Sequence, residues 1–176
     1  AAPRGQAIVA FDIDVKIMMD SGCPSDLAGK INMVKFMGKM KAVKPRSFNT
    51  ANGPSKTEWA LPARLKVLDD DQCEFLVMRS TPTVISVGKR CKRRFCFIWL
   101  RKKVPVVVTP SLKIIPLDVI NDVPYIKAGG LYTTLTDPRE VRRRTGVFIS
   151  KEGKLQIDVD APADACSAAP IERVVE

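Results

Sequence analysis

Short apolar runs that recur along most of the chain are the feature that most restricts its fold. They lie between residues 7 and 126 at spacings of about ten residues and are separated by proline, glycine and aspartate. Leu61, Ala63 and Leu65 illustrate the alternation of a strand with one buried face. About eight or nine such strands are typical of an all-β sandwich or barrel. Residues 31–40, with apolar side chains spaced by three, predict one short amphipathic helix.

One of the predicted strands, over residues 11–19, leads directly into Asp20, Ser21 and Gly22. A carboxylate at the end of a buried strand is costly unless something uses or pairs it. Glycine lets the chain turn so that backbone N–H groups can face the carboxylate, and a serine hydroxyl can both donate and accept. These are the parts of the catalytic loop of an aspartic peptidase. The triplet alone also fits an Asp-initiated turn after a strand.

The absence of histidine from the 176 residues restricts the chemistry further. It excludes Ser-His and Cys-His catalysis and His-ligated zinc, so acid–base work must come from carboxylates, lysine, tyrosine or thiols. The five cysteines are odd in number and form no Cys-x-x-Cys pair, which argues against a disulfide framework or a structural zinc. Residues 69–71, three aspartates, are interpreted as a solvated turn because no calcium-loop pattern follows. We therefore expect no metal or other cofactor.

The compartment is inferred from the cysteines and from hydropathy. Free thiols are typical of a reducing environment, so an intracellular, cytoplasmic location is expected. No apolar run approaches the roughly 20 residues that span a bilayer, so no membrane partner is expected. The chain also begins without an initiator methionine or the apolar region of a signal peptide, which suggests a fragment of a longer protein.

Two basic runs account for most of the net charge of +10, which results from 29 basic and 19 acidic residues. The first occupies residues 89–103 and the second residues 139–144. A basic field of this kind attracts nucleic acid or acidic peptides. The candidate nucleic-acid contacts in the first run are Lys89, Arg90, Lys92, Arg93 and Arg94. A solvated basic face without a partner is the other interpretation, because the few aromatic residues do not interleave with these runs.

Turn signals and composition divide the chain into a body and a tail. Asn52-Gly53 predicts a mobile hairpin, because a type I′ turn needs two residues at positive φ. From residue 128 the composition shifts to a basic and then an Ala/Pro-rich stretch that ends at residue 176. A small hairpin is expected at residues 146–159, and residues 161–176 have the composition of a disordered linker.

In combination, these motifs resemble the retropepsin-type aspartic protease segment of copia-type retrotransposon polyproteins. The resemblance covers about residues 6–127. Its motifs are the Met-Asp-Ser-Gly-Cys loop at residues 19–23, the hairpin at Thr50, Ala51, Asn52 and Gly53, the Pro-introduced Ile-Ser-Val-Gly run within residues 81–90, and the segments 115–117 and 123–126.

The resemblance implies a closed β-barrel of the acid-protease fold, with a short helix and a partly disordered C-terminal tail. With a single Asp-Ser-Gly in the chain, it implies a homodimer in which two copies of Asp20 form the catalytic dyad and cleave polyprotein peptides. Ser21 and Gly22 would complete the catalytic loop. The hairpin at residues 50–53 would be the flap over the substrate, and Val87 and Gly88 would form a supporting loop. The element's virus-like particles would be one place of action.

The same sequence leaves an alternative open. Pro24 and Ser25 stand where many retropepsins bind the substrate backbone, and Lys89-Arg90 follows Gly88 where the family often has Asn or Asp. These departures fit a catalytically decayed β-domain whose basic surface binds nucleic acid. A domesticated dimerisation module is a third interpretation.

Overall fold

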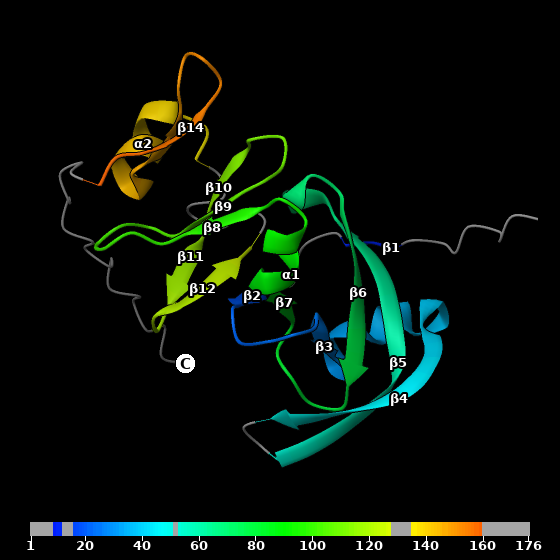
Figure 1. The fold of residues 1–176 in the computed structure, drawn as a ribbon. Helices are drawn as coiled ribbons and strands as arrows, with labels where there is room; N and C mark the ends of the chain where they lie inside the picture. Colours follow the sequence, from blue (N-terminus) through cyan, green and yellow to red (C-terminus); the bar gives the residue numbers. More distant parts are fainter. Residues whose placement is uncertain (1–8, 12–15, 51–52, 128–134, 160–176) are drawn as a thin grey trace, which may run out of the picture.

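The computed structural model describes residues 9–11, 16–50, 53–127 and 135–159. Most of its regular structure is β-strand, as Figure 1 shows. One sheet contains β1 (Val9–Phe11), β2 (Ile17–Asp20), β3 (Leu27–Gly29), β4 (Lys41–Thr50), β5 (Gly53–Leu65), β6 (Asp71–Met78), β7 (Val84–Ser86), β11 (Asp118–Ile120) and β12 (Val123–Ile126). A second contains β8 (Cys96–Ile98), β9 (Val106–Val108) and β10 (Ile114–Pro116), and a third contains β13 (Val147–Ile149) and β14 (Leu155–Ile157). The helices are α1 (Val87–Lys92), α2 (Pro138–Thr145) and the 3₁₀ segments η1 (Lys30–Lys39) and η2 (Lys66–Leu68).

The large sheet has the strand order β1-β5-β6-β3-β7-β2-β12-β11, with β4 paired to β5. Within the described residues no sheet closes on itself, because the three-residue strands β1 and β11 lie at opposite ends of this order and do not pair with each other. The predicted all-β fold is therefore confirmed, whereas the described strands form an open sheet rather than the expected closed barrel.

The larger core cluster lies on one face of this sheet and follows the alternation seen in the sequence. Leu61 and Leu65 of β5 are almost fully buried, as is Phe75 of the antiparallel neighbour β6. Ile85 of β7 and Ile126 of β12 belong to the same cluster. Because successive side chains of a strand point to opposite faces, this cluster fixes which face each strand turns inward.

The helix predicted over residues 31–40 is a 3₁₀ helix whose inward face differs from the expected one. Met33 is buried, whereas Ile31, Val34 and Met37 are at least half exposed. A 3₁₀ helix has three residues per turn, so residues spaced by three form one row. The row of Met33 and Phe36 packs on the core, and the row of Ile31 faces solvent.

Residues 135–159 form a helix and a hairpin that pack on the second sheet. Asp137 caps α2 by accepting a hydrogen bond from the Arg139 N–H, and Gly146 ends the helix with a φ of 71°. Val147 of β13 is buried with Val106 and Val108 of β9. The second basic run therefore lies on α2, beside the three-stranded sheet (Figure 1).

The rest of the predicted tail, residues 160–176, lies outside the described residues. In the part of the chain that the structure describes, no helix is both long and apolar enough to cross a bilayer.

Candidate active site

Asp20 is the last residue of β2, beside β7 near the middle of the large sheet. The two strands are parallel, and Asp20 is the register partner of Ser86 at the end of β7. The chain leaves both strands at the same edge of the sheet, which brings the start of α1 next to the Asp20 loop. Val87 and Gly88, the predicted supporting loop, are the first two residues of α1.

The Asp20 carboxylate is held by its own loop. Its Oδ1 accepts a hydrogen bond of 2.7 Å from the Gly22 N–H. A Cβ at position 22 would stand 3.4 Å from this oxygen, an ordinary van der Waals contact, so this hydrogen bond does not itself require glycine. Ser21 is exposed and Asp20 is half-buried, so both remain accessible to a substrate or a second chain.

A cavity of about 330 Å³ opens beside this carboxylate. Asp20, Ser21 and Asp122 form its polar part, and its apolar lining includes Val87, Phe97 and Trp99. A carboxylate beside an apolar wall can act on a polar bond of a substrate while the wall buries a neighbouring apolar side chain of the same substrate. Another groove, of about 590 Å³, lies between η1, β5 and β6 and does not include Asp20.

The predicted flap corresponds to the tip of the β4–β5 hairpin. Thr50 pairs with Gly53, whose φ of 98° is a conformation that favours glycine. Ala51 and Asn52 lie outside the described residues. Figure 1 shows the hairpin projecting from the body of the sheet.

An apolar cluster connects the hairpin to the Asp20 loop. Phe48 of β4 packs against the cluster that contains Leu27 and Val84, and Met18 and Cys23, on either side of Asp20, pack against the same cluster. The hairpin and the loop therefore share one apolar face.

Sequence analysis missed Asp26, a buried carboxylate in the loop that follows Asp20. Its side chain is about 2% exposed. Its Oδ1 accepts a hydrogen bond of 2.9 Å from the N–H of Ser86 and another from Nη1 of Arg90. The sequence does show a second carboxylate, Asp26, soon after Asp20, but no local pattern indicates that Arg90 is its partner.

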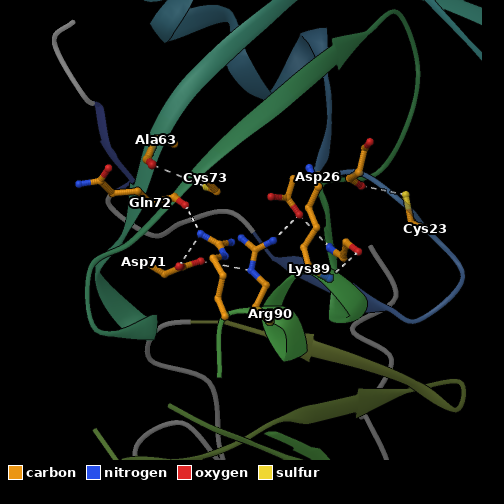
Figure 2. Close-up of polar contacts among 11 residues, drawn as sticks. Cys23, Asp26, Ala63, Asp71, Gln72, Cys73, Lys89 and Arg90 are labelled. Atoms are coloured by element: carbon orange, nitrogen blue, oxygen red, sulfur yellow. Dashed lines mark hydrogen bonds and ion pairs between the residues drawn. The ribbon is translucent and has the colours of Figure 1, made fainter. Parts of the chain in front are cut away.

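Arg90, predicted to contact nucleic acid, is only 1% exposed, and that assignment is wrong for this residue. Figure 2 shows its guanidinium between Asp26 and Asp71. Its Nε lies 3.2 Å from Oδ2 of Asp71, and Nη1 of Arg93 lies 2.8 Å from Oδ1 of the same carboxylate. Arg90 thus faces two carboxylates and Arg93 faces one of them, and these opposite charges offset part of the cost of burying the Arg90 guanidinium.

The other members of the predicted nucleic-acid set remain nearer the surface. Lys92 and Arg94 are exposed, whereas Lys89 and Arg93 are partly buried. Asp71 also differs from the solvated turn expected for residues 69–71, because its side chain is 7% exposed. Burial raises the pKa of the Asp71 carboxyl, and the charges of Arg90 and Arg93 oppose this shift.

Metal ligands and thiols add little to this site. Among the described residues, no group of three or more His, Cys, Asp or Glu side chains could hold a metal ion. The four described cysteines, which are Cys23, Cys73, Cys91 and Cys96, are free thiols. Burial raises the pKa of Cys23, the neighbour of Gly22.

No protein-family model matches the sequence, and searches of curated proteins and of solved structures find no match either.

Proposed function

We propose that this chain is an aspartic endopeptidase that cleaves polyprotein peptides as a homodimer, with one Asp20 from each copy. The observation that carries the proposal is the position of Asp20. It ends a central strand, its carboxylate is held by the Gly22 N–H, and an apolar cavity opens beside it. An intracellular site of action, including virus-like particles, belongs to the same proposal.

The fold that we propose is a retropepsin-like variant of the acid-protease fold, with the open sheet described above. The parallel pair of β2 and β7 and the insertion of β3 between β6 and β7 support it. The long β4–β5 hairpin, with its apolar link to the Asp20 loop, provides the element that would cover a substrate.

The chemistry follows from two carboxylates that approach each other. Such a pair cannot ionise freely at both members, so it holds one proton over the pH range in which the dyad is active. The ionised Asp20 takes a proton from a water molecule, and the protonated Asp20 of the second copy polarises the scissile carbonyl. Because a single chain contributes one such aspartate, the mechanism requires the dimer.

Cleavage of a peptide substrate tests this proposal. The full chain would be incubated at about pH 5, where a carboxylate dyad can hold one proton, with a polyprotein fragment that spans its flanks. We expect cleavage that a transition-state inhibitor of aspartic proteases blocks and that Asp20→Ala abolishes. The matched control is Asp70→Asn, an exposed aspartate at positive φ, which should cleave like the wild type. Absence of cleavage by folded, dimeric protein would contradict the proposal.

The nucleic-acid alternative is less well supported by the geometry. Arg90 is buried, and Arg93 is partly exposed but paired with Asp71, so one of its five proposed contacts faces inward and a second is already engaged in an ion pair. Binding through the remaining charges would weaken steeply with added salt and would not change in Asp20→Ala. An affinity that does not depend on salt would exclude this alternative.

A further inference from the structure

We propose that Arg90 is a positioning residue for Asp20 that acts through Asp26. This inference rests on the proposed function, since it concerns the same site. Arg90 lies in α1, and Asp26 lies in the loop between β2 and β3. Figure 2 shows the two side chains pointing toward each other.

A short chain of contacts connects Arg90 to Asp20. Arg90 Nη1 donates to Asp26 Oδ1, and the same oxygen accepts from the Ser86 N–H at 2.9 Å. Ser86 is in turn the register partner of Asp20. The Asp26 carboxylate therefore ties the end of β7 to the loop that carries Asp20, and Arg90 keeps this carboxylate in place.

A second contact of the guanidinium, with Asp71, explains why an arginine is needed. Nε of Arg90 lies 3.2 Å from Asp71 Oδ2, at the beginning of β6. A planar guanidinium can face two carboxylates from different sides at once, whereas a lysine ammonium is a compact charge at the end of a flexible stem. Arg90 thus spans from the Asp20 loop to β6.

Burial makes the Asp26 carboxylate dependent on this partner. Both side chains are at most about 2% exposed, so water cannot replace the guanidinium without rearrangement. Without Arg90, Asp26 would be an uncompensated buried group or would turn toward solvent, and its hydrogen bond with Ser86 would weaken. The ends of β2 and β7 would then lose the contact that aligns them.

Misalignment of Asp20 would affect turnover more than substrate binding. A displacement of about 1 Å at a reacting group can cost about 100-fold in rate. Phe97 and Trp99, in the wall of the cavity beside Asp20, are not members of these ion pairs. We therefore expect Arg90→Met to lower kcat per folded molecule by about 100-fold, with KM changed by less than about threefold.

The test compares full-length variants in the peptide assay, with kcat and KM referred to the folded fraction. The set is Arg90→Met, Arg90→Lys, Asp26→Ala, the double variant Arg90→Met/Asp26→Ala, and Lys92→Met as the matched control. Lys92 is an exposed residue of the same helix and should leave kcat unchanged. Because Arg90 acts through Asp26, the double variant should lose no more kcat than the worse single variant.

Arg90→Lys keeps a positive charge, so it is measured in place of Arg90→Met if Arg90→Met does not fold. Whichever of the two is measured is called the readable Arg90 variant. We expect the kcat of Arg90→Lys to lie between those of the wild type and Asp26→Ala. A wild-type kcat per folded molecule in the readable Arg90 variant, or additive losses in the double variant, would overturn the positioning role.

Hydrogen exchange at the Ser86 amide separates this inference from the proposed function, because it needs no cleavage. The amide should exchange at least about tenfold faster in Asp26→Ala and in the readable Arg90 variant than in wild type or Lys92→Met. If the wild type cleaves no peptide, the proposed function fails, and the positioning role of Arg90 fails with it. Faster exchange would then still show that Arg90 holds Asp26 on Ser86, and unchanged exchange would overturn that link as well.

Discussion

The two basic runs look alike in the sequence but have different places in the fold. Residues 89–94 follow the first two residues of α1, close to the end of β7, and Arg90 among them is almost fully buried. Residues 139–144 lie on α2, where the side chains of Arg142, Arg143 and Arg144 are 40–51% exposed. A run of basic residues in the sequence therefore does not by itself indicate a solvent-exposed surface.

The difference lies in where the acidic partners come from. Asp26 and Asp71, the partners of Arg90, belong to other strands or loops of the large sheet. Glu140, the partner of Arg143 and Arg144, lies on the same helix, and Arg142 pairs with Asp158 beyond the nearby hairpin while its guanidinium stacks on Phe148 at 4.0 Å. The long-range pairs join segments of the core, and the local pairs remain in solvent.

Arg90→Met should give the largest effect on stability. Removing one partner of a buried ion pair leaves an uncompensated charge, which typically costs about 3–5 kcal/mol. Urea unfolding of the variant and the wild type, followed by circular dichroism, measures the difference. A loss below about 1 kcal/mol would mean that the buried cluster contributes no more than a surface pair.

Cysteine reactivity provides a second contrast between interior and surface. Burial raises the pKa of Cys73, beside the buried cluster, to about 12. At pH 8 its thiolate fraction should be at least about 100-fold below that of an ordinary cysteine, so alkylation of Cys73 should be much slower than alkylation of the exposed Cys91. Peptide mapping by mass spectrometry after timed alkylation gives both rates. Equal rates would show that Cys73 is not protected by the fold.

Arg93→Gln should have a smaller effect than Arg90→Met. Its guanidinium lies 2.8 Å from Asp71, but the side chain is 38% exposed and water can take its place. We expect a loss of about 1 kcal/mol in the free energy of unfolding, near the upper end for solvent-exposed pairs. A loss as large as that of Arg90→Met would mean that the network depends equally on both arginines.

Glu140→Gln should give the smallest change. Hydrogen bonds from Arg143 and Arg144 lower the pKa of Glu140 to about 2. A lowered pKa stabilises the folded state at pH values above the ordinary value for glutamate, and this contribution is lost as the pH falls through about 2. The Tm difference between variant and wild type should be small at pH 7 and should shrink as the pH falls from 5 toward 2. A difference that grows on acidification would contradict this sign.

Local patterns in the sequence were sufficient for part of the fold. Alternation identified β5, with Leu61 and Leu65 facing the core, because a period of two is a property of the strand itself. The Asp-Pro pair at residues 137–138 and Gly146 are start and stop signals for α2, although composition alone suggested a tail there. The spacing in residues 31–40 did indicate a helix, but a spacing of three fits either face of a 3₁₀ helix.

The buried cluster was beyond the reach of sequence patterns. Asp26, Asp71 and Arg90 are far apart in the chain, and only the pairing of β3 with β6 and of β2 with β7 brings them together. Asp20 was recognisable as a candidate catalytic residue because its loop is a contiguous sequence motif. The residues that hold this loop were not recognisable, because their relation is tertiary.

A subunit-mixing experiment tests most directly the claim that two copies of Asp20 form one active site. Wild type and Asp20→Ala would be mixed in equal amounts, allowed to exchange subunits, and assayed for peptide cleavage. If both copies of Asp20 are required, only wild-type dimers cleave, and about one quarter of the activity of an all-wild-type sample of the same total concentration remains. Retention of about one half would mean that each chain acts alone, and would contradict the shared dyad.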